Sequence, residues 1–72
     1  MGLLVALGEA ARVRGFALGG ASVIEAEDPG AVRQRFAALP ADTSVLVLTE
    51  RARSALGREL EQYPGLWVVI PP

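Results

Sequence analysis

The stretch GFALGGASVIEAEDPGAVRQRFAALPADTSVLVLTE, residues 15–50, decides the fold. It runs from a glycine-rich helix end through a short strand and a helix to an apolar strand followed by Thr49-Glu50. The helix carries the clearest signals, because Asp28 is a favoured N-cap and Pro29 suits the first helical position. Apolar residues then recur at helical spacing up to Pro40: Val32, Phe36 and Leu39. The stretch therefore predicts a strand–helix–strand unit.

Continuous apolar runs indicate three strands, two of which lie outside this stretch. A strand that is apolar at every position is typical of a parallel sheet covered by helices on both faces. The runs are Leu3–Leu7, Val45–Leu48 and Leu66–Ile70. A weaker segment, Ala21–Ile24, is followed by Glu25 and Glu27, which is typical of a strand at the sheet edge.

Two weaker helical patterns fill the remaining gaps. The first starts at Glu9 and ends at Gly19-Gly20, a glycine stop signal. The second starts at Thr49-Glu50, ends at Tyr63-Pro64-Gly65, and is expected to bury residues at successive i+4 steps: Ala52, Leu56 and Leu60. Each pattern contains an internal glycine, which costs about 1 kcal/mol relative to alanine: Gly15 and Gly57.

The order β-α-β-α-β-α-β, with short connections, predicts a single α/β domain over residues 1–72. Right-handed crossovers favour a four-stranded parallel sheet, and the edge-like second strand favours the order 2-1-3-4 of flavodoxin-like and receiver-like folds. In this three-layer arrangement the first helix lies alone on one face, and the second and third helices share the other. Apolar sheet surface beside the first helix must then be covered by something else.

Composition limits the classes of function. A chain of 72 residues buries only about 60% of its unfolded surface, so stability is thin. A net charge of -1 gives no electrostatic reason to expect nucleic acid or an anionic membrane. Cys, His and Lys are absent, which removes thiol and imidazole chemistry. Without a basic leader or an apolar run of about 20 residues, we expect a cytoplasmic protein with no direct membrane insertion.

Two ligand-binding motifs of α/β domains are not matched by this sequence. The glycines from Gly15 to Gly20 resemble a phosphate loop only superficially, because they lie at a helix end and no lysine is present. A phosphorelay receiver needs an aspartate after the third strand, where this chain has Thr49-Glu50. We therefore expect no enzymatic activity, no cofactor and no metal.

Acidic residues follow both strands expected at the sheet centre. Glu9 and Glu50 could meet there as a carboxylate pair at the topological switch point. The favoured alternative is structural: Thr49 caps the third helix, while Glu9 and Glu50 complement helix dipoles in their first turns.

The joint order of these motifs resembles the F subunit of V/A-type rotary ATPases over nearly the whole chain. The matching segments are Gly8-Glu9, Gly15-Phe16-Ala17-Leu18-Gly19, Val23–Asp28, Val45–Glu50 and Trp67–Pro71. The resemblance implies a non-catalytic central-stalk subunit that binds the coiled-coil shaft subunit, with the catalytic head subunits as further partners. Its setting is an ATPase complex at the membrane that couples proton or sodium transport to ATP synthesis or hydrolysis. Family members usually continue into a C-terminal helical segment, whereas this sequence stops at Pro71-Pro72.

A partner interface is predicted around the first helix and the switch point. Phe16 and Leu18 are the expected exposed apolar contacts, with Arg12 as a polar rim residue; Thr49 and Glu50 complete the set. The rival interpretation makes Phe16 a core residue. The alternative function is a free-standing flavodoxin-like module that binds a small ligand or serves regulation.

Overall fold

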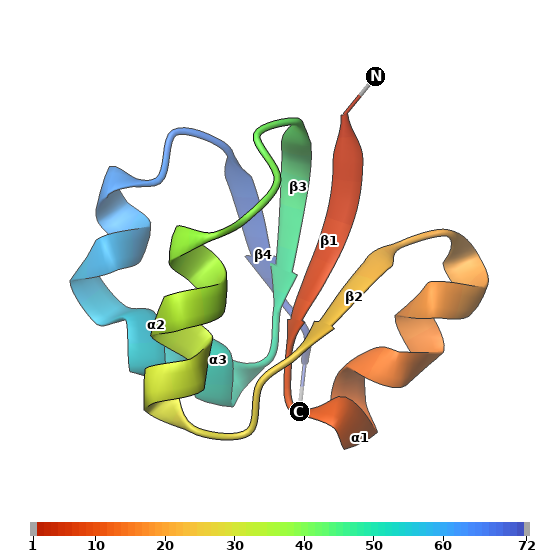
Figure 1. The fold of residues 1–72 in the computed structure, drawn as a ribbon, viewed down its shortest axis with the longest axis horizontal. Coiled ribbons are helices and arrows are strands. Elements are labelled where there is room, and N and C mark those ends of the chain that lie inside the picture. The colour runs from red at the N-terminus through yellow and green to blue at the C-terminus, as the bar shows by residue number, and fades with distance from the viewer. Residues whose placement is uncertain (1, 72) are drawn as a thin grey trace.

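In the computed structural model, which describes residues 2–71, four parallel strands form one sheet in the order β2-β1-β3-β4 (Figure 1). The predicted α/β fold, its parallel sheet and its strand order are confirmed. The strands are β1 Leu3–Gly8, β2 Ser22–Glu25, β3 Thr43–Leu48 and β4 Leu66–Val69.

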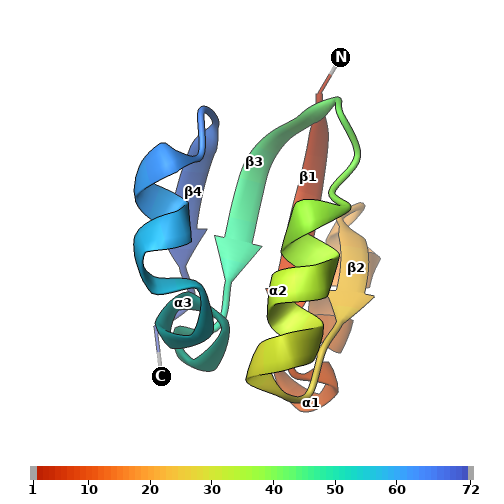
Figure 2. The same cartoon turned by 60° about the vertical axis from the view of Figure 1, so that its left-hand side comes forward.

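The register aligns residues in rows across the sheet. Figure 2 shows the strands side by side from β4 to β2. Ala6 of β1 pairs with Val23 of β2 and with Val47 of β3, and Val47 pairs with Val68 of β4. Because side chains alternate between faces along a strand, each row presents its side chains to one face.

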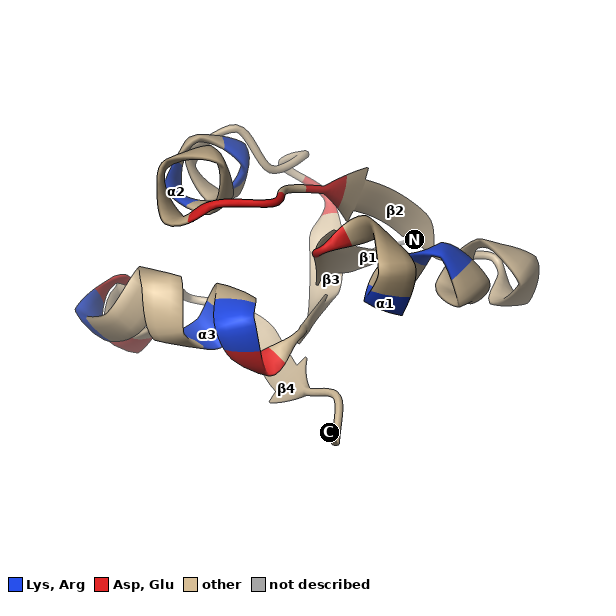
Figure 3. Ribbon diagram, turned by 90° about the horizontal axis from the view of Figure 1, so that it is seen from below, with Lys and Arg blue, Asp and Glu red and all other residues tan. Residues whose placement is uncertain are grey.

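Helices cover the two faces unequally, as predicted. Figure 3 shows α2 (Pro29–Ala37) and α3 (Glu50–Leu56) on one face and α1 (Ala10–Val13) on the other. The predicted entry to α2 is confirmed, because Asp28 Oδ1 accepts a hydrogen bond from Ala31 N at 2.8 Å and Pro29 occupies the first turn.

The first helix is shorter than the sequence predicted. The α-helical part ends at Val13, and the chain continues as the 3₁₀ helix η1, Arg14–Gly19. Glu9 makes no side-chain capping bond to this helix, and Gly15 is the second residue after its end, so little holds a longer α-helix together. The predicted glycine stop is correct, since Gly20 adopts φ 90°.

The third helix also changes form. Gly57 has φ 51°, a conformation that side chains disfavour, and it divides α3 from the 3₁₀ helix η2, Gly57–Gln62. The burial prediction holds in spite of this break: Ala52, Leu56 and Leu60 are all buried.

The core has two parts of different size. The larger lies between the sheet and the α2/α3 pair and includes four strand residues with no exposed surface: Val5, Leu7, Leu46 and Leu48. The smaller lies beneath α1 and consists of Ala6, Val13 and Val47, with Phe16, Val23, Val45 and Ile70 packed partly buried around it.

Candidate functional site

The sheet face that carries α1 is partly uncovered. Exposed large apolar side chains lie on it at β1 and β4: Leu4 at 38%, Leu66 at 61% and Val68 at 44% exposure. We call these three residues, with Val45 between them, the open face. Along their strands they alternate with residues of the larger core. They therefore project to the same face as Ala6 and Val47 of the smaller core.

Exposure on this side of the sheet is greatest at β4, the strand farthest from α1. In the row Ala6–Val47–Val68, exposure rises from 0% to 7% to 44% as the row moves toward β4. A second row, Leu4–Val45–Leu66, ends at the most exposed of these residues, Leu66. The expectation that helices cover both faces of Leu66–Ile70 is therefore wrong for Leu66 and Val68, because α1 is too short to reach β4.

Three predicted interface residues lie on α1 and η1, beside this face. Leu18 is exposed at 95%, as expected. Phe16 is partly buried against the smaller core, which favours the rival interpretation of that side chain. Arg12 is exposed, and its Nη2 donates a hydrogen bond to the carbonyl oxygen of Pro71 at 2.9 Å, so it ties α1 to the chain after β4.

The other two predicted interface residues have structural contacts. Thr49 is buried, its Oγ1 accepts a hydrogen bond from Ala52 N at 3.2 Å, and its hydroxyl donates to Glu9 Oε1. Thr49 is thus the predicted cap of α3. Glu50 is exposed in the first turn of α3 and accepts hydrogen bonds from Arg53 Nε at 3.1 and 3.2 Å. Glu9 and Glu50 therefore bond to different partners, in line with the structural alternative.

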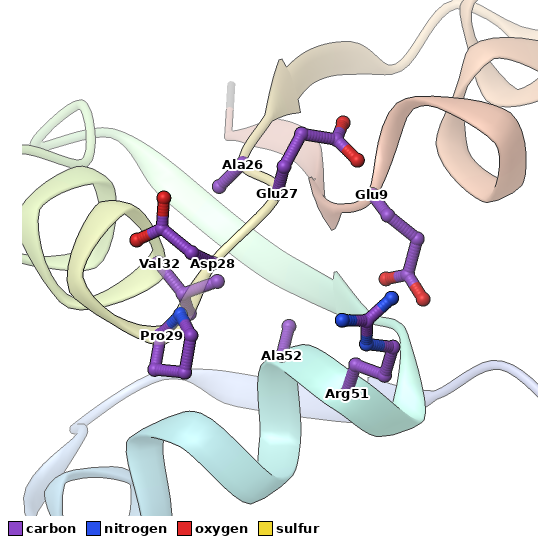
Figure 4. Close-up of a pocket in the computed structure, with 8 residues that line it drawn as sticks. All are labelled: Glu9, Ala26, Glu27, Asp28, Pro29, Val32, Arg51 and Ala52. Atoms are coloured by element: carbon purple, nitrogen blue, oxygen red, sulfur yellow. The ribbon is translucent and has the colours of Figure 1, made fainter.

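A small cavity lies at the carboxyl ends of the central strands (Figure 4). Its volume is about 50 Å³, and its polar lining comes from Glu9, Glu27, Asp28 and Arg51. A space of this size can hold a few water molecules at most. Glu27 Oε2 accepts a hydrogen bond from Ala10 N at 2.9 Å and thereby caps α1 from a distant part of the chain. Two of the acidic side chains, those of Glu27 and Asp28, thus serve as helix caps.

The charge state of Glu9 reflects its contacts in this region. Partial burial acts to raise the pKa of Glu9, but the hydrogen bond from Thr49 and the nearby guanidinium groups of Arg51 and Arg12 outweigh it and hold the pKa below its ordinary value. Glu9 is therefore a carboxylate at neutral pH. Within residues 2–71, no three His, Cys, Asp or Glu side chains gather in an arrangement that could hold a metal ion.

Sequence reasoning missed two groups of residues. Leu4, Leu66 and Val68 were placed in strands, and the apolar surface beside the first helix was expected, but which side chains form it depends on the register. Glu27 reaches the switch-point cavity although no local motif marks it, whereas Arg51 directly follows the Thr49-Glu50 pair that the sequence places there.

In comparisons with protein-family models, curated proteins and solved structures, the chain has no significant match. The resemblance to rotary ATPase F subunits thus depends on the quoted residues alone. Among residues 2–71, no helix has the length and apolar character needed to cross a membrane.

Proposed function

We propose that this chain is a non-catalytic central-stalk subunit of a V/A-type rotary ATPase, which binds the coiled-coil shaft subunit through the open face. In this role it contributes to ion transport coupled to ATP synthesis or hydrolysis without an active site of its own. The single observation that carries the proposal is the exposure of Leu4, Leu66 and Val68 on one face of the sheet. The order of motifs along the sequence is the reason for proposing this family.

A helix is the partner that such a surface fits best. In α/β domains, the apolar faces of the sheet are buried by helices. Strands lie about 4.8 Å apart, so β1, β3 and β4 span about 10 Å, the diameter of one helix with its side chains. An amphipathic helix of a coiled coil can lay its apolar stripe along these strands, next to α1. Arg12, which is hydrogen-bonded to Pro71 after β4, then borders the contact on the α1 side.

The alternative, a small-ligand module, has the switch-point cavity as its natural site. Pockets for drug-sized ligands are about 300–1,000 Å³, whereas this cavity holds about 50 Å³. Two of its polar groups, those of Glu27 and Asp28, also cap helices. The switch-point cavity is therefore too small for a drug-sized ligand.

Titration of the purified chain with the coiled-coil shaft subunit tests the proposal. Leu66→Ser should weaken binding at least tenfold, about 1.4 kcal/mol, since it places a hydroxyl at the most exposed point of the open face. Ala37→Ser, at an exposed position of α2 behind the sheet, is the matched control and should leave affinity unchanged. Absence of binding by the unmodified chain contradicts the function, and full affinity of Leu66→Ser contradicts the open-face assignment.

A further inference from the structure

The two edges of the sheet differ in their protection against pairing. At the β2 edge, Glu25 forms an ion pair with Arg14 of η1 at 3.2 Å, and charge at an edge strand discourages further pairing. At the β4 edge, the run Leu66–Ile70 contains no charged residue, and the neighbouring prolines Pro64 and Pro71 lie outside the strand. β4 is thus the unprotected edge.

The free edge of β4 presents unpaired backbone groups. Ile70 N donates a hydrogen bond to Leu48 O at 2.8 Å, so Ile70 faces β3. Alternate residues of a parallel strand face the same neighbour, which means that Leu66 and Val68 also face β3. The N–H and C=O groups of Trp67 and Val69 therefore point away from the sheet, and within residues 2–71 no strand pairs with them. Another extended strand can pair with this row of backbone N–H and C=O groups.

We propose that β4 pairs antiparallel with β4 of a second copy of this chain, which joins two sheets into one of eight strands. The pairing has its two-fold axis at Val68, so Val68 lies opposite its own copy. Trp67 then exchanges both backbone hydrogen bonds with Val69 of the second copy, and Leu66 lies opposite Ile70. This register uses the outward-facing groups of both strands.

The second copy is favoured over an unrelated strand because β4 is complementary to itself. Every opposed pair in this register is apolar, and no charge meets a like charge. A two-fold axis normal to the sheet gives an isologous, closed contact, in which the same patch is used twice. The pairing uses the backbone edge, whereas the proposed shaft contact uses side chains of the open face, so either proposal can fail without the other.

Cysteine cross-linking tests the register directly, because the natural chain contains no cysteine. Val68→Cys places two sulfurs at a non-hydrogen-bonded antiparallel pair, where Cα atoms about 4.5 Å apart lie within the range of a disulfide. Mild oxidation should give a covalent dimer. Leu4→Cys, also on the open face but on β1, is the control and should stay monomeric. Equal cross-linking of both variants would show face-to-face stacking and overturn the proposal.

A proline variant tests the role of the free backbone group. Val69→Pro removes the outward N–H without touching the β3 ladder, and Val69→Ala shortens the same side chain while keeping the N–H. In sedimentation up to about 1 mM, where weak contacts are populated, the natural chain and Val69→Ala should dimerise, whereas Val69→Pro should not. A natural chain that is monomeric throughout this range contradicts the proposal. If Val69→Pro fails to fold, amide exchange of Val69 in the natural chain decides instead: protection should rise with protein concentration, and constant protection contradicts the proposal.

Discussion

The two faces of the sheet come from the same strands but have different surroundings. Within β4, Trp67 and Val69 on the α2/α3 face are half-buried, whereas Leu66 and Val68 on the other face are 61% and 44% exposed. The difference lies in the helices: α2 has nine residues and is joined by α3, while α1 has four. Apolar character along a strand therefore does not show that the chain itself covers both faces.

This contrast separates residues that hold the fold from residues free to bind a partner. Burial of a leucine side chain contributes about 2–3 kcal/mol, and an exposed leucine contributes little of this to folding. The stability of a small domain is itself only a few kcal/mol. The covered face should thus dominate stability, and substitutions on the open face should act on association.

The largest expected effect is at Leu48, which lies at the carboxyl end of β3 and is fully buried on the covered face. Leu48→Ala should lower the free energy of unfolding by about 3 kcal/mol, because it removes buried methyl groups and leaves a cavity. Leu66→Ala, the same change on the open face, should cost no more than about 0.5 kcal/mol. Urea denaturation of both variants measures the difference. Similar urea midpoints for the two variants would contradict the claim that the covered face dominates stability.

A substitution at Phe16 tests whether this partly buried side chain belongs to the fold or to the partner interface. Since its side chain is partly buried on the smaller core, Phe16→Ala should cost about 2 kcal/mol, less than a fully buried phenylalanine. Leu18→Ala, two residues further along the chain and exposed at 95%, is the control and should leave the melting temperature unchanged. An unchanged melting curve for Phe16→Ala with reduced shaft binding would return Phe16 to the interface as a pure contact residue.

The N-terminus of α2 tests how much the capping of a helix on the covered face contributes to stability. Asp28→Ala removes the acceptor for Ala31 N and should cost about 1 kcal/mol. In a domain of this size, that corresponds to a drop of about 4–8 °C in melting temperature. Asp28→Asn keeps a capping acceptor and should recover most of the loss. Equal melting temperatures for Asp28→Ala and the natural chain would show that the cap contributes nothing.

The smallest expected effect is a pH dependence at Glu9. Its folded-state pKa lies below the ordinary value of 4.5, so its contacts stabilise the fold fully above pH 4.5. This contribution is lost as the pH falls through the folded-state pKa. The difference in unfolding free energy between the natural chain and Glu9→Gln should therefore shrink below pH 4.5. A difference that stays constant from neutral to acid pH would show that Glu9 has no special role.

Much of the fold could be predicted because each element carries local signals. The Asp28-Pro29 entry, the Gly19-Gly20 stop and the apolar strand cores all lie where the sequence placed them. The helix forms were less predictable: Gly15 and Gly57 signalled weakness, but whether a weak helix shortens or turns 3₁₀ depends on its packing.

The candidate site was only partly predictable because it depends on register. The sequence indicated uncovered surface beside the first helix, yet Leu66 and Val68 join Leu4 on one face only through the pairing of β1, β3 and β4. Likewise, Glu27 caps Ala10 across 17 residues, a contact that no local pattern predicts.

Backbone NMR of the chain tests whether the open face is the surface that binds the shaft subunit. On addition of the coiled-coil shaft subunit, chemical-shift changes should concentrate at Leu4, Val45, Leu66 and Val68, with smaller changes at Arg12 and Leu18. Residues behind the sheet, such as Gln34 of α2 and Arg58 of η2, should keep their shifts. Changes concentrated on α2 and α3 or at the switch-point cavity, or no changes at all, would contradict the assignment of the open face as the binding surface.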